Sequence, residues 1–256
     1  MKILVCIKQV PESDAAPGTD QSEKWVVFNQ HLKYKMNRFD EYALEEALLI
    51  KEVSSGVSID VITVGSEMSG EVIKRAFGMG ADRGVHLVIR DDKYIDPNTI
   101  AKLIADEAQK EKYDLILTGI MSEDMMQAQT GQMIAEYLNI PCSTSIISLD
   151  IQPDQCSVVA KREIEGGLRE GIKTQLPALF TIQAGINTPR YPTLSNILKA
   201  DTKELVSIEK STGEQRQKAV SVLPPIKSRA GTFLEGSAED KAGQLYSILK
   251  DKNSLI

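Results

Sequence analysis

The sequence has few cysteines and histidines, and their scarcity argues against two kinds of site. The three cysteines are Cys6, Cys142 and Cys156, and the two histidines are His31 and His86. These residues are too scattered for metal-ligand spacing, and an odd cysteine count in a chain of 256 residues is typical of a reducing compartment. We therefore expect neither a structural metal nor a disulfide.

Long apolar runs and blocks of basic residues are also missing. No apolar stretch approaches membrane-spanning length, and the opening MKILVCIKQV lacks the long apolar segment and cleavage site of a secretory signal. The net charge is −6, from 30 Lys and Arg against 36 Asp and Glu, which argues against nucleic acid as a partner. With 42% hydrophobic residues to fill a core, we expect a cytoplasmic globular protein without membrane insertion.

Strand-like and helix-like segments alternate through the first half of the chain. The strand-like runs are apolar at nearly every position, as in parallel strands covered by helices on both faces, and the helix-like runs carry apolar stripes. The strand-like runs are 3–7, 59–64, 84–89 and 113–119, and the helix-like runs are 40–53, 69–80, 98–112 and 130–138. This order predicts a doubly wound α/β fold with a mostly parallel, Rossmann-like sheet over about the first 140 residues.

The pattern changes after Pro141. Strand-like segments with few helical stripes follow, and they predict an antiparallel or mixed extension of the same sheet: 142–151, 156–167 and 168–182. A polar stretch then leads to 237–250, which has the pattern of a final capped helix. We therefore expect an α/β domain over 1–200 and an extended C-terminal arm with a helix over 201–256.

Ligands of open α/β sheets bind at the carboxyl ends of the strands, and the most informative of these ends is residues 119–133, GIMSEDMMQAQTGQM. This segment leads into a helix whose free backbone N–H groups suit a phosphate; an ordinary loop with N-cap residues is the alternative.

No GxxxxGK[ST] motif is present, and GMGADRG runs from a helix into a strand, the reverse of the dinucleotide order. Two histidines do not complete a catalytic triad, so the pattern indicates a binder or carrier without its own reactive group.

A second segment, TPRYPTLSNILKA at 188–200, is unusually stiff. Proline fixes its own backbone and pushes the preceding residue towards extended conformations, so no helix forms before Pro192. The segment then presents the apolar Leu194. It is either a packed connector or a docking element.

Several motifs together resemble the β subunit of electron transfer flavoproteins. They cover nearly the whole chain, and their order and spacing are far more specific than any one of them. The motifs are KILVCIKQVP, NRFDEYALEEAL, GMGADRG, DLILTG, QTGQM, REIEGG, LPAL and PRYPTLSNILKA.

The resemblance implies a doubly wound fold of the adenine nucleotide alpha hydrolase-like type that holds a buried AMP with a structural role. A larger α subunit, in a heterodimer with this chain, would carry most of the binding domain for FAD. The AMP contacts implied by the resemblance are Cys6, Asn37, Arg38, Phe39, Asp40, Val64, Gly119, Asp124, Gln127, Ala128, Gln129 and Thr130.

The resemblance also implies protein partners and surfaces that bind them. Residues 188–200 would be a recognition loop that docks an acyl-CoA-type dehydrogenase through Leu194, and electrons would pass through FAD towards a quinone oxidoreductase. The implied docking residues are Pro189, Arg190, Tyr191, Leu194 and Ile197, and the implied contacts with the α subunit are Arg162 and Glu163, together with the C-terminal arm. The chain itself would not be an enzyme.

Two other functions compete with this one. In an electron-bifurcating relative, a second FAD would replace AMP and the complex would oxidise NADH, although QTGQM and FDEYALEEAL look more like the AMP type. A stand-alone ATP-binding or ATP-hydrolysing domain is disfavoured because no base, metal carboxylates or glycine-rich phosphate loop are evident.

The chain also departs from the family's usual residues at two places. Ile120 to Glu123 replace the usual Lys-Gln-Ala-Ile, and Arg38 replaces a proline.

Overall fold

The structure is a computed structural model of the 256-residue chain, and its described residues are 1–12, 18–19, 25–27, 32–90, 94–223, 231 and 233–251. His31 lies outside the described residues. The chain forms two compact units, Met1–Val222 and Leu223–Ile256.

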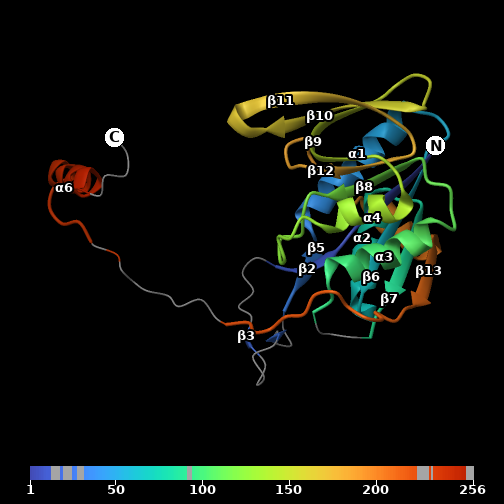
Figure 1. Ribbon diagram of the computed structural model, residues 1–256, viewed down its shortest axis with the longest axis horizontal. Helices are drawn as coiled ribbons and strands as arrows, with labels where there is room; N and C mark the ends of the chain where they lie inside the picture. Colours follow the sequence, from blue (N-terminus) through green and yellow to red (C-terminus); the bar gives the residue numbers. More distant parts are fainter. Residues whose placement is uncertain are drawn as a thin grey trace. The chain divides into compact units, whose positions relative to one another are not determined.

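One large sheet organises the first unit (Figure 1). Its strands, among the described residues, run in the order β11, β10, β9, β12, β8, β1, β6, β7, β13. Of these strands, only β10 runs in the direction opposite to the others. The strands are β1 (Lys2–Cys6), β6 (Ser58–Gly65), β7 (Arg83–Val88), β8 (Leu115–Gly119), β9 (Cys142–Ile151), β10 (Ser157–Ile164), β11 (Leu168–Gln175), β12 (Ala178–Ile182) and β13 (Glu204–Glu209).

Helices and two short ribbons complete this unit. The ribbons pair β2 (Gln9–Pro11) with β5 (Tyr34–Met36) and β3 (Gly18–Thr19) with β4 (Val26–Val27). The helices are α1 (Arg38–Val53), α2 (Glu71–Met79), α3 (Pro97–Ala108), α4 (Thr130–Leu138) and α5 (Leu194–Lys199), with short 3₁₀ turns at Glu67–Gly70, Glu165–Gly167 and Ala200–Thr202.

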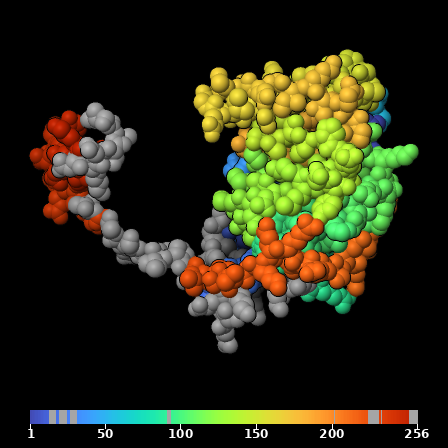
Figure 2. All heavy atoms as spheres, in the orientation of Figure 1, coloured from blue at the N-terminus to red at the C-terminus, as the bar shows by residue number. Residues whose placement is uncertain are grey.

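Both faces of the sheet are buried by helices, which explains why its central strands are continuously apolar. Successive side chains of a strand point to opposite faces, so Ile3 and Val5 of β1 pack with α1 and α2, whereas Leu4 and Cys6 pack with α3 and α4. The predicted doubly wound, mostly parallel fold is confirmed. The predicted antiparallel or mixed extension after Pro141 is confirmed as a mixed one. In it β9 and β12 run parallel to each other, and β10 and β11 form an antiparallel hairpin at the edge of this unit (Figure 2).

The strand order reverses beside β1. The chain first adds β6 and β7 on one side of β1 and then crosses to β8 on the other side. In open α/β sheets the loops after two such strands separate and leave a crevice at their carboxyl ends. Here the crevice lies after Cys6 and Gly119.

Most predicted segments agree with the observed elements to within a few residues. The predicted segment 130–138 coincides with α4, and 142–151 coincides with β9. The helix predicted over 98–112 ends earlier, at Ala108, where the apolar stripe stops and a run of polar residues begins. No helix within the described ranges is long and apolar enough to cross a membrane.

The second unit contains α6 (Ala238–Asp251), which confirms the predicted final helix. Ser237 caps it, because its hydroxyl accepts a hydrogen bond from the backbone N–H of Asp240 at 3.2 Å. The helix leaves large apolar side chains exposed, at Leu245, Tyr246, Ile248 and Leu249. The division of the chain at residue 200 and the packing of the arm on another subunit remain predictions.

Gly80 ends α2 in a backbone conformation that glycine favours, with φ of +138°. A Cβ at this position would also lie 2.8 Å from Leu48 of α1. We predict that Gly80→Ala lowers the free energy of unfolding by about 1–3 kcal/mol in urea denaturation. The matched control is Gly171→Ala in β11, where an added Cβ meets no atom within 4 Å. Equal stability of the two variants would contradict the prediction.

Candidate functional site

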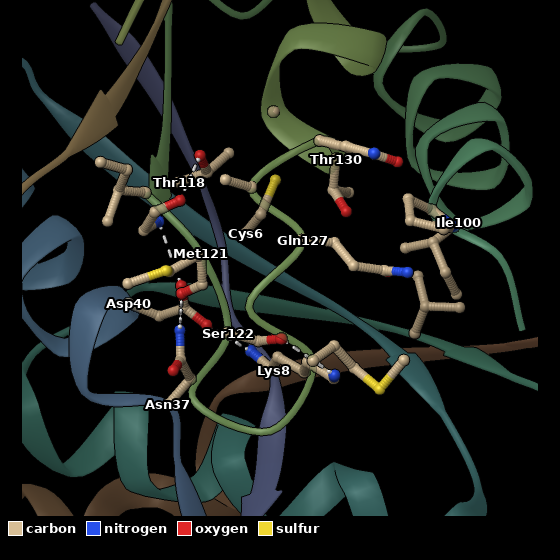
Figure 3. Close-up of a pocket in the computed structure, with 18 of the residues that line it drawn as sticks. Cys6, Lys8, Asn37, Asp40, Ile100, Thr118, Met121, Ser122, Gln127 and Thr130 are labelled. Atoms are coloured by element: carbon tan, nitrogen blue, oxygen red, sulfur yellow. Dashed lines mark hydrogen bonds between the residues drawn. The ribbon is translucent and has the colours of Figure 1, made fainter. Parts of the chain in front are cut away.

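A pocket of about 140 Å³ opens in the crevice at the carboxyl ends of β1 and β8 (Figure 3). Its lining comes from five parts of the sequence that the fold brings together. These are the end of β1, the end of β6, the start of α1, the beginning of α3, and most of the segment from β8 to α4. The pocket therefore lies where the topology of the sheet predicts a ligand.

Asp40 joins the two strands on either side of the crevice. Its carboxyl oxygens accept hydrogen bonds from the backbone N–H of Lys8 at 2.8 Å and from the backbone N–H of Gly119 at 3.0 Å. Burial raises the pKa of Asp40 to about 7, although the hydrogen bonds from Asn37, Lys8 and Gly119 favour the charged form and oppose this rise. A side chain at Gly119 would overlap Phe39, whose Cβ is 2.6 Å from the position of an added Cβ. The start of α1 is thus held tightly against both strand ends.

Asn37 fixes the loop that follows β8. Its side-chain amide donates to the carbonyl of Met121 at 2.9 Å, and its side-chain oxygen accepts from the N–H of Glu123 at 3.1 Å. Asn37 is the first residue before α1, but no side-chain capping bond to that helix is present. Its side chain instead closes the loop over the pocket.

Two ion pairs hold the same loop from the outer side. Lys8 Nζ lies 2.7 Å from the carboxylate of Asp124, and Lys35 Nζ lies 3.1 Å from that of Glu123. Lys8 also donates to the hydroxyl of Ser122 at 3.3 Å. Because these pairs are partly exposed, each contributes little to stability, but together they define where the loop lies.

The segment before α4 offers groups that suit an anion and a hydrogen-bond donor. Met126 and Ala128 both have φ of +51°, which is uncommon for residues with side chains. Gln129 Oε1 is buried without a hydrogen-bond partner, and an unpaired buried acceptor needs a donor from a ligand or water. The first N–H groups of α4 have no partner within the helix, and they carry the positive end of its dipole.

The opposite wall of the pocket is apolar and comes from the start of α3. Ile95, Pro97, Ile100 and Ile104 line it, and Met125 adds a flexible side chain from the loop. Figure 3 shows Gln127 reaching from the loop towards Ile100. A flat, weakly polar group such as a nucleobase fits between such a wall and the polar loop.

Nine of the residues predicted as cofactor contacts line this pocket: Cys6, Asn37, Asp40, Val64, Gly119, Gln127, Ala128, Gln129 and Thr130. Phe39 and Asp124 lie just behind the lining, where they support Gly119 and Lys8. Arg38 is exposed, and its backbone N–H donates to Glu123 at 3.2 Å. Burial raises the pKa of the Cys6 thiol, so this residue behaves as a small neutral hydrophobe.

Sequence reasoning missed the wall that α3 provides. Ile95, Pro97, Ile100 and Ile104 follow no strand end in the pocket and belong to no motif of the resemblance. The spacing of Pro97, Ile100 and Ile104 predicts one buried helix face, but not which part of it faces a cavity. That outcome depends on how α3 packs against α4.

The segment over 188–200 exposes several apolar side chains. The exposed fractions are 86% for Tyr191, 72% for Leu194, 50% for Ile197 and 74% for Leu198. Thr193 caps α5, because its hydroxyl accepts from the N–H of Asn196 at 3.2 Å. Clustered exposed apolar residues on a soluble domain mark an interaction surface more often than isolated ones do.

The base of this segment is fixed to α1 and α2. The guanidinium of Arg190 donates to the buried carboxylate of Glu45 at 2.8 Å and to that of Glu52 at 2.6 Å. Hydrogen bonds to both carboxylates raise the pKa of Arg190, so its charge is permanent. Thr193 N donates to the carbonyl of Gly78 at 3.1 Å, and Pro192 lies against Gly78. Arg190 thus holds the segment in place from within its own chain.

Arg162 and Glu163, predicted to meet another subunit, lie far from the pocket in sequence, in the β10–β11 hairpin. Arg162 forms an ion pair with Glu170 at 2.6 Å on the neighbouring strand. Ile164 and Leu168 at the end of the hairpin are exposed by 40% and 64%. Binding of another subunit at this hairpin remains a prediction.

The fold and the pocket together define a doubly wound α/β protein with a candidate ligand site at its topological switch point. Residues 24–212 match the electron transfer flavoprotein domain family. Electron transfer flavoprotein subunit beta of Bacillus subtilis (strain 168) is 34% identical over 245 residues, which cover 93% of this chain and 90% of the relative. The same subunit of Dictyostelium discoideum is 37% identical over 239 residues, which cover 92% of this chain and 93% of the relative. The human subunit is 33% identical over 256 residues, which cover 97% of this chain and 98% of the relative.

The chain therefore belongs to the electron transfer flavoprotein β-subunit family, and the resemblance inferred from its motifs is confirmed. Membership of this family assigns the chain to electron transfer. The family match over residues 24–212 contains the exposed segment 188–200 and the pocket residues from Asn37 onwards.

The raised pKa of Asp40 leads to a prediction about how the free energy of unfolding depends on pH. In the folded state Asp40 keeps its proton up to about pH 7, whereas an unfolded aspartate loses its proton near pH 4. The contribution of Asp40 to the free energy of unfolding therefore falls as the pH rises from about 4 to about 7. Asp40→Asn abolishes that fall. It also loses one accepted hydrogen bond at every pH, at a cost of about 1–3 kcal/mol.

Urea denaturation of both proteins at about pH 5 and about pH 8 tests this prediction. The difference in unfolding free energy between the natural protein and Asp40→Asn should be larger at the lower pH, by on the order of 2 kcal/mol. A difference that does not change with pH would show that Asp40 is already charged at pH 5.

Proposed function

We propose that this chain is the β subunit of a heterodimeric electron transfer flavoprotein that carries electrons from acyl-CoA-type dehydrogenases towards a quinone oxidoreductase. An α subunit holds most of the FAD, and this chain holds AMP in the pocket after β1 and β8. The observation that carries the proposal is the pocket itself: it combines an unpaired buried acceptor, a helix N-terminus and an apolar wall. The proposal adds the cofactors and partners to the family assignment.

The residues of the pocket fit an adenylate. The N–H groups at the start of α4 suit the phosphate, since they are unpaired donors at the positive end of a helix. Gln129 Oε1 suits a donor on the ligand, such as the amino group of adenine or a ribose hydroxyl. Ile95, Ile100 and Ile104 suit the faces of the base. AMP would be held by Gln127 to Thr130, with Asn37 and Asp40 fixing the loops around it.

FAD supplies the redox chemistry of such a complex when it is bound, and AMP has none. The work of this chain is therefore to bind and to position. Asp40 joins the strand ends, Asn37 closes the loop after β8, and the ion pairs of Lys8 and Lys35 keep that loop in place. These contacts surround a structural ligand and limit the entry of water.

Docking of the dehydrogenase fits the segment over 188–200. Leu194 is exposed by 72% at the start of α5, while Arg190 and Thr193 fix the base of the segment. Because the base is already ordered, little conformational entropy is lost when a partner binds. Burial of one leucine contributes roughly 1.5–3 kcal/mol, which suits a selective but short-lived contact.

The exposed apolar side chains of α6 fit an arm that packs on the α subunit. Leu245, Tyr246, Ile248 and Leu249 are spaced at three and four residues, so they share a stripe of the helix. A stripe of this kind needs a partner to cover it. Docking of a dehydrogenase through this chain leaves the flavin-bearing subunit free to move towards its electron donor.

The alternative proposal is an electron-bifurcating complex, in which the pocket binds a second FAD and the complex oxidises NADH. One observation favours AMP over this alternative. The loop that ends the pocket is fixed by Asn37 and by the ion pair of Lys8 with Asp124. A dinucleotide would need that loop to move.

The identity of the bound nucleotide distinguishes the two. We predict that the complex of this chain with its α subunit, denatured after purification, releases AMP and FAD in about equal amounts by mass spectrometry. Two equivalents of FAD without AMP would favour the bifurcating alternative. Release of FAD alone, with no second nucleotide, would contradict nucleotide binding in this pocket.

The docking role of Leu194 has its own test. We predict that Leu194→Ala lowers the rate of electron transfer from a dehydrogenase by about tenfold, since the lost burial is worth about 1.5 kcal/mol. Unfolding free energy and flavin content should not change, because the side chain is exposed. Met68→Ala is the control, since Met68 is 61% exposed in a different part of the chain. Equal rates for both variants would refute docking through Leu194.

A further inference from the structure

The segment that follows β13 passes close to the pocket. We call residues 210–222 the strap; it is the last part of the first unit. Figure 2 shows the strap in orange, against the green atoms that precede and begin α3. Three of its residues, Gln215, Arg216 and Gln217, form hydrogen bonds with the stretch that leads into α3.

Two of these bonds involve Asp96, which is fully buried. The backbone N–H of Asp96 donates to Gln215 Oε1 at 3.1 Å, and the Asp96 carboxylate accepts from the backbone N–H of Arg216 at 3.1 Å. The same carboxylate caps α3 by accepting from the N–H of Thr99 at 3.0 Å. The strap is therefore attached to the residue that starts α3. The adjoining Ile95 and Pro97 line the pocket.

The third bond continues into the pocket itself. The hydroxyl of Tyr94 lies 3.1 Å from Gln217 Oε1 and 3.1 Å from Gln127 Nε2. A phenol has one proton to donate and lone pairs that accept, so Tyr94 donates to Gln217 and accepts from Gln127. Gln127 lines the pocket at the loop before α4. A continuous relay thus joins the strap to a residue that faces the ligand space.

We infer that Tyr94 and Gln217 are positioning residues for the nucleotide pocket, and that the strap holds the ligand in place by fixing Gln127 and the start of α3. Without the acceptor of Gln217, the Tyr94 hydroxyl has no fixed orientation, and Gln127 loses its fixed partner. The inference rests on the proposed AMP site for the identity of the ligand. It adds that retention of the ligand depends on a segment about 90 residues away in sequence from Gln127, near the end of the first unit.

The test uses the complex of the full chain with its α subunit, loaded with labelled AMP and then chased with excess unlabelled AMP. We expect Tyr94→Phe and Gln217→Ala each to release AMP about fivefold faster, the effect of losing one hydrogen bond of about 1 kcal/mol. The double variant should release AMP no faster than the single variants, because both changes break one relay. Gln217→Glu should release AMP at the natural rate, because a carboxylate oxygen also accepts from Tyr94.

Tyr137→Phe is the matched control. The hydroxyl of Tyr137 donates to Asn98 Oδ1 at 2.8 Å in the first turn of α3, so this variant loses a tyrosine hydrogen bond near the same helix start but none that reaches the pocket. Release at the natural rate by Tyr94→Phe and Gln217→Ala, or equally fast release by Tyr137→Phe, would overturn the inference and leave the AMP site intact.

A second readout does not depend on the ligand. Amide hydrogen exchange of residues 94–104 and 120–131, measured without AMP, should be faster in Gln217→Ala than in the natural protein and normal in Gln217→Glu. If the natural complex binds no AMP, the proposed ligand is wrong. The amide hydrogen exchange still tests whether the strap fixes residues 94–104 and 120–131. Unchanged exchange in Gln217→Ala would then refute the inference.

Discussion

The carboxyl group of Asp40 is the contact on which the rest of the site depends. Parallel strands β1 and β8 are neighbours in the sheet, but their loops leave in opposite directions, so nothing in the strand ladder holds their ends together past Cys6 and Gly119. Asp40 supplies that link, since its two oxygens accept one backbone N–H from each side. Such a carboxyl has to be buried, and burial raises its pKa to about 7. The group that holds the crevice together is therefore a buried carboxyl group whose charged form is disfavoured by burial.

Helix α1 connects the pocket to the segment proposed to dock a partner. Its first turn carries Asp40, and the next turns carry Glu45 and Glu52, which bind Arg190. A helix of 16 residues is stiff, so the position of Leu194 relative to the pocket is determined by one rigid element. This arrangement separates two tasks. One end of α1 closes the candidate site, and its outer face supports the segment proposed to dock a partner.

Much of the site could be predicted from sequence, because the decisive signals are local. Continuous apolar strands, the helical stripe of 40–53 and the polar loop before α4 identified the sheet, its first helix and the loop that covers the pocket. Arg190 shows what this reasoning leaves out. The resemblance implied contact with a partner, which remains a prediction, and the structure adds that its guanidinium binds Glu45 and Glu52 of the same chain, more than 130 residues earlier. The apolar wall of Ile95, Ile100 and Ile104 was missed for the same reason.

The sequence by itself determined the fold class, the order of the elements and the family, because periodicity, turn residues and motif order are properties of neighbouring positions. It also indicated the strand ends where a ligand would lie. Only the tertiary structure decided which side chains meet there: the bridge of Asp40, the closure by Asn37, and the relay from Gln217 through Tyr94 to Gln127. The physical reason is that each of these contacts joins residues separated by about 30 to 120 positions, and a hydrogen bond requires its two atoms to be placed within a few tenths of an ångström.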